Sequence, residues 1–169
     1  MKLSVCIPVY NFDVQELVNS LKKEIIKAQL NAEIILIDDA STKDFVSVNE
    51  PLIKIANQFI FLEKNIGRSA IRNLFLKYAS GDFLLFLDCD AKIISENFLQ
   101  NYLQFIEKNK DTKVIFGGFE VEQGTLTLRK KYSLEREIIP LEKRKKAPYS
   151  SFRGINFLVI IEILQQFFF

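Results

Sequence analysis

Short apolar runs that alternate with amphipathic stretches are the feature that most restricts the fold of this chain. The β-type runs in the first 120 residues are 3–9, 33–37, 59–62, 83–87 and 113–119. Between them, apolar residues recur at the spacing of helices, as in 69–79 and 95–107. Apolar strands separated by helices indicate a mostly parallel sheet with helices on both faces. We therefore expect an α/β, Rossmann-like fold in a single domain, and we expect the helix over 69–79 to stop at Gly81.

Histidine is missing from all 169 residues of the chain. The chain by itself therefore supplies no histidine general base, no Ser-His or Cys-His pair and no zinc site that contains histidine. Catalysis must use carboxylates, Lys or Arg, Tyr, hydroxyls or a hard metal ion. Cys6 and Cys89 lie inside apolar runs, which predicts buried, reduced thiols.

The overall charge is mild and does not indicate a nucleic-acid partner, since the net charge is only +2. The apolar stretch 157–169 contains Glu162 and has 13 residues, whereas a membrane span needs roughly 20. We expect a cytoplasmic protein. Residues 129–146 contain eight basic and three acidic side chains, and three explanations stay open: a solvated face, a site for an anionic acceptor, or contact with an anionic membrane surface.

Acidic residues follow two of the expected strands. Asp38 and Asp39 follow the second strand, and Asp88 and Asp90 follow the fourth. Ligands of parallel sheets bind at the carboxyl ends of the strands, so these side chains are expected to face one crevice. The Asp-x-Asp pair suits Mn²⁺ or Mg²⁺ completed by a diphosphate, although such a pair also occurs as a simple polar strand end.

Two further polar segments have both a structural and a functional interpretation. The segment 38–42 is either a turn that leads into a helix or a contact for a base or ribose. Arg68 and Arg72 lie one turn apart where a helix begins, which suits either a phosphate or a solvated face.

The order of the motifs decides between these interpretations. Pro-Val-Tyr-Asn at 8–11 follows the first strand, Asp-Asp-Ala-Ser at 38–41 follows the second, and Asn-x-Gly-x-x-x-x-Arg-Asn at 65–73 enters a helix. Ala-x-Gly-Asp at 79–82 then precedes the strand that ends in Asp-Cys-Asp at 88–90. As an ordered set, these motifs resemble the nucleotide-binding half of family 2 glycosyltransferases, which have the GT-A fold. The resemblance covers residues 2–120.

The resemblance implies an inverting, metal-dependent transfer of a sugar from a nucleoside diphosphate sugar, with a UDP-sugar expected. The acceptor is a hydroxyl of a glycan or of a lipid-linked molecule, in the synthesis of cell-surface polysaccharide or glycans. The implied nucleotide-sugar-binding residues are Pro8, Val9, Tyr10, Asn11, Asp39, Arg72 and Asp88. Asp88 and Asp90 are the implied residues for Mn²⁺ or Mg²⁺, and the metal would stabilise charge on the departing diphosphate.

The catalytic base of the family has no counterpart that we can assign. Residues 154–158 match the family segment Gly-x-Asn-Phe-Leu, after which the family continues through a helix to an acidic stretch. Here Glu162 is the only acidic residue after Glu142, and it lies inside the expected helix. The catalytic residue is therefore unknown. We expect residues 1–124 to form the nucleotide-sugar-binding core and 125–169 to form part of the acceptor side, incomplete at the C-terminus.

Three explanations of this incomplete pattern stay open: a truncated product, a nucleotide-sugar-binding module without transferase activity, and a short active form that uses a base from elsewhere. The apolar end Phe167–Phe169 is unfavourable when exposed. It indicates burial against the sheet, a homodimer contact or an artificial terminus. Peripheral contact with the inner face of the membrane is a further open alternative.

Overall fold

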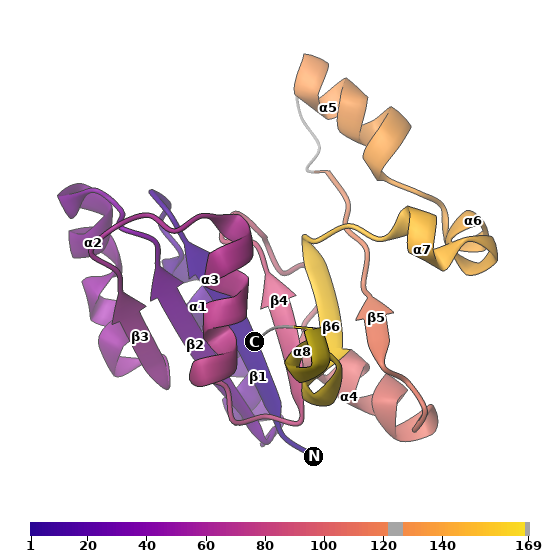
Figure 1. Ribbon diagram of the computed structural model, residues 1–169, viewed down its shortest axis with the longest axis horizontal. Helices are drawn as coiled ribbons and strands as arrows, with labels where there is room; N and C mark the ends of the chain where they lie inside the picture. The colour runs from indigo at the N-terminus through magenta and orange to yellow at the C-terminus, as the bar shows by residue number, and fades with distance from the viewer. Residues whose placement is uncertain (122–126, 168–169) are drawn as a thin grey trace.

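The computed structural model describes residues 1–121 and 127–167. Within these ranges one sheet has the strand order β3-β2-β1-β4-β6-β5 (Figure 1). The strands are β1 (Leu3–Val9), β2 (Ala32–Asp38), β3 (Gln58–Phe61), β4 (Phe83–Leu87), β5 (Val114–Phe116) and β6 (Asn156–Ile160). β1 is parallel to β2 and β4, and β2 is parallel to β3. β6 lies antiparallel between β4 and β5, so β4 and β5 run in the same direction.

Helices cover both faces of this sheet. The helices are α1 (Gln15–Lys27), α2 (Lys43–Asn49), α3 (Arg68–Leu74), α4 (Phe98–Lys108), α5 (Leu128–Tyr132), α6 (Leu141–Lys146), α7 (Pro148–Ser151) and α8 (Ile161–Phe167). The structure also has two short 3₁₀ helices, η1 (Glu50–Lys54) and η2 (Phe75–Lys77), and one short π-helix, η3 (Ser133–Glu137). In Figure 1, α5, α6 and α7 project away from the layered body on the side of β5. No helix in the described part of the chain is long and apolar enough to cross a membrane.

The alternation of side chains along the central strands produces two separate cores. Val5 and Ile7 of β1 pack with α1 and α4 on one face, whereas Cys6 packs with α3 on the other. Every residue of β4 is buried, as its uninterrupted apolar sequence predicts. The expected α/β architecture with a mostly parallel sheet is confirmed. The two cysteines are free, as expected, but Cys89 is only partly buried.

Several boundaries differ from those expected. β1 and β4 have the predicted bounds, but α4 begins at Phe98 rather than at Ser95. The strand β6 was not predicted, because a short apolar run next to a helix shows no periodicity that distinguishes strand from helix. The expected boundary between core and acceptor side, at residue 124, lies outside the described residues. So do Phe168 and Phe169.

Gly81 does not end the helix that precedes it, so this prediction is wrong. The helical segment ends with η2, and the left-handed glycines of the described chain are Gly67 and Gly118. A Cβ on Gly81 would lie 2.7 Å from the backbone nitrogen of Ser4. The glycine is therefore required by the close approach of two backbones, which no local pattern reveals.

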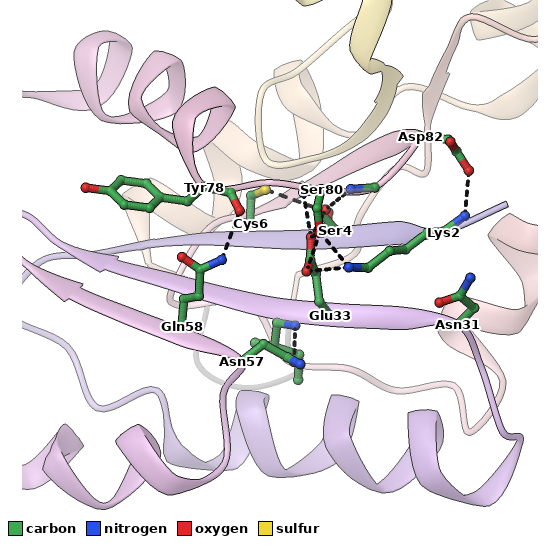
Figure 2. A network of polar contacts seen from close by, with 12 residues as sticks. Lys2, Ser4, Cys6, Asn31, Glu33, Asn57, Gln58, Tyr78, Ser80 and Asp82 are labelled. Atoms are coloured by element: carbon green, nitrogen blue, oxygen red, sulfur yellow. Dashed lines mark hydrogen bonds and ion pairs between the residues drawn. The ribbon is translucent and has the colours of Figure 1, made fainter.

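A buried carboxylate joins the strands at their amino ends. Figure 2 shows side chains of Lys2, Ser4 and Ser80 around Glu33, which is 5% exposed. The Lys2 Nζ atom lies 2.8 Å from Oε2, and the Ser4 hydroxyl donates to Oε1 at 2.5 Å. The Ser80 backbone N–H also donates to Oε1, at 2.8 Å. Burial by itself would raise the pKa of Glu33, but these hydrogen bonds outweigh it and lower the pKa below its ordinary value.

We predict that Glu33→Gln lowers the free energy of unfolding at pH 7 by about 1–3 kcal/mol, because the charged hydrogen bonds are lost. The folded-state pKa of Glu33 is lowered, so its contribution is complete above the unfolded pKa of about 4.3 and is lost as the pH falls through the folded pKa. Urea denaturation at several pH values measures this. The variant should show a weaker loss of stability in acid than the wild type.

The matched control is Glu107→Gln, which removes the same charge from an exposed position on α4. This control should change the free energy of unfolding by less than about 0.5 kcal/mol. Equal stability of Glu33→Gln and Glu107→Gln would contradict the structural role of the Glu33 network.

Candidate active site at the carboxyl edge of the sheet

The loops that follow β1 and β2 are joined to each other by hydrogen bonds. The Asp39 N–H donates to the Val9 carbonyl at 2.8 Å, and the Asn11 N–H donates to the Ser41 hydroxyl at 2.8 Å. The Asn11 side-chain oxygen in turn accepts from the Thr42 N–H at 2.8 Å. Asn11 has a φ of +48°, a conformation that asparagine tolerates better than most residues. The first two strand ends therefore form one continuous rim.

The structure places the four residues of 8–11 in different environments. The Val9 side chain is fully buried in the core. Only its backbone faces the rim, and its carbonyl already accepts the bond from Asp39. Pro8 and Asn11 are half-buried, whereas Tyr10 is 52% exposed and free to contact a ligand. A contact between Val9 and a nucleotide would thus involve backbone atoms.

Asp39 fixes the loop that leads into α3. Its Oδ1 accepts the Ile66 N–H at 2.7 Å, and its Oδ2 accepts the Gly67 N–H at 3.0 Å. The Asp39 carbonyl also accepts from the Asn65 amide at 3.1 Å. Asp39 is 5% exposed, and each of its oxygens has one further acceptor position, because a carboxylate has about four. The sequence indicated a ligand contact at Asp39 but gave no sign of this second, structural role.

Asp38, the neighbour of Asp39, is 1% exposed. Its Oδ1 accepts the Ser41 N–H at 2.7 Å, as in the expected turn. Its Oδ2 is buried and has no hydrogen-bond partner within the described chain. The two neighbouring carboxylates therefore differ in function: Asp38 shapes the turn, and Asp39 holds the entry to α3.

Arg72 joins three elements at this edge. Its Nη2 donates to Asp88 Oδ1 at 3.0 Å and also donates to the Gly154 carbonyl. Its guanidinium lies over the Phe157 ring, 5.7 Å from the ring centroid. The Asp88 N–H donates to the Ile155 carbonyl at 3.1 Å. The end of β4, the start of β6 and α3 are thus held together, and the structure brings the predicted site residues Arg72 and Asp88 into direct contact.

Asp88 and Asp90 provide two carboxylates of different character. Burial raises the pKa of Asp88; the positive charges of Arg72 and Arg68 oppose this shift, and the charge of Asp90 adds to it. Asp90 itself is exposed. Among the described residues, no group of three or more acidic, Cys or His side chains gathers around a common point. The donor set fits a hard divalent cation that takes its other ligands from water and substrate phosphates.

Asn156, the first residue of β6, lies beside the end of β4 and makes contacts that the sequence did not reveal. Its Oδ1 accepts from the Tyr102 hydroxyl at 2.7 Å, and its Nδ2 donates to the Gly118 carbonyl at 3.0 Å. A Cβ on Gly117 would lie 1.9 Å from the Tyr102 hydroxyl oxygen, so this turn needs glycine. The only available sequence signal was the Gly-x-Asn-Phe-Leu match at 154–158.

The sequence matches Glycosyl transferase family 2 over residues 4–163. The chain belongs to this family. It is 36% identical over 108 residues to an uncharacterized glycosyltransferase of Rickettsia conorii. The matched region covers 64% of this chain and 18% of that protein. It is also 35% identical over 113 residues to the poly(ribitol-phosphate) beta-N-acetylglucosaminyltransferase TarS of Staphylococcus aureus, covering 64% of this chain and 19% of TarS. The chain thus spans about a fifth of the length of these relatives.

Solved structures of glycosyltransferases have the same GT-A fold. Residues 1–349 of S. aureus TarS, in complex with UDP-GlcNAc, superpose with a TM-score of 0.59 at 32% identity, covering 73% of this chain and 37% of that one. The mannosyltransferase PcManGT from Pyrobaculum calidifontis, in complex with GDP-Man and Mn²⁺, gives a TM-score of 0.65 over 98% of this chain and 46% of its own. At 19% identity, this second likeness shows the fold alone.

We predict that Asp39→Asn loosens the loop before α3 in this family 2 chain. An amide has one acceptor oxygen, so one of the two backbone N–H groups at Ile66 and Gly67 loses its partner. The free energy of unfolding should fall by about 1–3 kcal/mol. Hydrogen–deuterium exchange at the amides of 65–67 should become faster than in the wild type.

The exposed Asp111→Asn is the control, because it makes the same chemical change far from this loop. Unchanged exchange at 65–67 in Asp39→Asn would show that the two carboxylate bonds do not order the loop.

Proposed function

We propose that this chain binds the nucleotide of a UDP-sugar at the carboxyl edge of β1, β2 and β4. The sugar is then transferred, with inversion, to an acceptor hydroxyl in the synthesis of cell-surface polysaccharide or glycans. The observation that carries the proposal is the Arg72–Asp88 pair, with Asp90 beside it, at the same sheet edge as the Asp39 rim. The TarS structure with bound UDP-GlcNAc, at 32% identity, supports a uridine nucleotide.

The residues of the rim would bind the nucleoside. Asp39 keeps acceptor capacity for an N–H of the base, because each of its oxygens accepts one hydrogen bond from the loop before α3. Tyr10 offers an exposed ring for stacking, and Asn11 is fixed in position by its two bonds to the β2 loop. Pro8 and the Val9 backbone would line the inner wall of this subsite.

Asp88 and Asp90 would hold Mn²⁺ or Mg²⁺ on the diphosphate side. Bound there, the ion would act as a Lewis acid that neutralises charge on the leaving diphosphate. Arg72 fixes the orientation of Asp88 by binding one of its oxygens, which leaves the other oxygen for a ligand. The guanidinium also places positive charge next to the position of the diphosphate.

The acceptor side would be built by residues of the 125–169 region, with 1–124 as the nucleotide-sugar-binding core. β6 begins beside Asp88, so its preceding segment at 154–155 lies next to the proposed transfer position. Glu162 lies on α8 and is exposed, in agreement with its expected place inside a helix. We assign no catalytic base. The acceptor would be a glycan or lipid-linked hydroxyl, reached on the cytoplasmic side of the membrane.

We predict that calorimetry detects Mn²⁺-dependent binding of uridine diphosphate to the wild-type chain. Asp90→Ala should weaken binding in Mn²⁺ by about tenfold or more, equal to roughly 1.4 kcal/mol, and should abolish the difference between Mn²⁺ and chelator. Removal of one of only two carboxylate ligands is the physical reason.

Asp111→Ala is the matched control and should bind uridine diphosphate like the wild type, because Asp111 lies on an exposed turn. Equal affinity of the wild type with Mn²⁺ and with chelator would overturn the metal assignment. Absence of any uridine diphosphate binding would overturn the nucleotide site itself.

A further inference from the structure

Arg144 on α6 carries a charge that has no counter-ion among residues 1–121 and 127–167. Its Nη1 lies 3.5 Å from the Phe116 carbonyl, at the limit of a hydrogen bond. Its Nε is buried and has no partner within the described residues. Its guanidinium lies 5.4 Å from the centroid of the Phe116 ring. The side chain is thus held in place mainly by an aromatic ring and one weak bond.

Three carboxylates of the same region have partners of their own, and Glu120, which is exposed, makes no ion pair with Arg144 in the described chain. Glu142 pairs with Lys145 at 3.2 Å, and Glu135 pairs with Lys131 at 3.9 Å. Glu137 accepts the Ser133 hydroxyl at 2.6 Å. Over the described residues, no salt bridge reaches Arg144, although it is half-buried. A guanidinium removed from water without a neutralising group is costly, so this position favours an external anion.

Arg72 provides a comparison within the same molecule, because its charge is paired with a carboxylate. Arg72 and Arg144 both have a buried Nε without a partner. Arg72, however, contacts the Asp88 carboxylate at 3.0 Å and a carbonyl of the β6 segment. Arg144 has a comparable setting of ring and carbonyl but lacks the carboxylate. The missing component at Arg144 is therefore an anion.

The position of Arg144 connects it to the proposed transfer site. Phe116, Phe152 and Phe157 form one cluster. The ring centroids of Phe116 and Phe152 lie 5.8 Å apart, and those of Phe152 and Phe157 lie 5.1 Å apart. Arg144 lies over Phe116 at one end, and Arg72 lies over Phe157 at the other. β5 runs in the same direction as β4, so the end of β5 reaches the same sheet edge as Asp88.

Glycine at residue 118 lets the backbone after β5 approach the guanidinium closely. Gly118 has a φ of +80°, and a Cβ there would lie 2.8 Å from Arg144 Nη1. Any side chain at this residue would therefore clash with the guanidinium in its present position. Lys143, Lys145 and Lys146 lie on the same short helix and add positive potential around it. In Figure 1, α6 lies beyond β5, at the end of the strand order opposite to β3 and β2.

We infer that Arg144 binds a phosphate group of an anionic acceptor. This inference rests on the proposed function, because it assigns the acceptor side of the same site. The planar guanidinium can donate two parallel N–H bonds to phosphate oxygens, which an ammonium cannot do. The donor diphosphate belongs at the Arg72 end, next to Asp88 and Asp90, and the three phenyl rings separate that end from Arg144. The anion at Arg144 is thus a second one.

The test is an NMR titration of the isotope-labelled full chain with glycerol 3-phosphate, and with uncharged glycerol as the matched ligand. We predict saturable shifts of the amides of 116–118 and 144 with glycerol 3-phosphate and none with glycerol. Arg144→Gln should weaken binding by about fivefold or more, because the bidentate contact is lost. Arg144→Lys, which keeps the charge but not the fork, should give an intermediate loss.

Arg136→Gln is the control variant, because it removes the same charge from an exposed position in the same region. It should change the affinity by less than about twofold, since exposed charges are screened over distance. Uridine diphosphate binding in Mn²⁺ should be unchanged in Arg144→Gln, which shows that the variant is folded and separates the two sites.

The possible results distinguish this inference from the proposed function. Unchanged glycerol 3-phosphate affinity in Arg144→Gln, or an equal loss in Arg136→Gln, would overturn the anion site while leaving uridine diphosphate binding intact. If the wild type does not bind uridine diphosphate but does bind glycerol 3-phosphate at Arg144, the proposed function alone is overturned. Binding of phosphatidylglycerol vesicles through Arg144 without any glycerol 3-phosphate binding would overturn the acceptor site in favour of a lipid surface.

Discussion

The parallel pairing of β1 with both β2 and β4 is the constraint on which the rest of the structure depends. Leu3 is in register with Ala32 on one side and with Phe83 on the other, so the three strands begin at one level. The buried Glu33 carboxylate accepts hydrogen bonds from β1 and from the segment before β4, and it fixes this alignment at the amino ends. Because the strands run in the same direction, the polar residues that follow them are delivered to the opposite edge.

At that edge, the side chains of the proposed site also hold the loops together. Asp39 holds the entry to α3 with both oxygens, and that helix carries Arg72, which in turn fixes Asp88. The positions of the rim, the helix and the Asp-x-Asp pair are therefore interdependent. Such coupling keeps the acidic groups in a preorganised arrangement, so the proposed binding of a diphosphate with its cation would need little rearrangement of the loops.

Charge is distributed unequally along the edge. The ends of β2 and β4 carry carboxylates, whereas α6 beyond β5 carries a run of four basic residues. The antiparallel strand β6 lies between these two regions, and its start contacts both: Ile155, just before the strand, bonds to Asp88, and Asn156 bonds to Gly118. A donor diphosphate with its cation on the acidic side and an anionic acceptor on the basic side would be electrostatically complementary to this arrangement.

The sequence by itself determined the alternation of strands and helices, the burial of β1 and β4, and the residues that follow the strands, because hydrophobic periodicity and local turn chemistry are short-range properties. The ordered motifs also determined the family. Only the tertiary structure decided that β6 inserts antiparallel beside β4, that Gly81 is needed against the Ser4 backbone, and that Arg72 pairs with Asp88 while Arg144 finds no carboxylate in the part of the chain that the structure describes. These features depend on contacts between residues far apart in the chain, and no local pattern records which distant groups will meet.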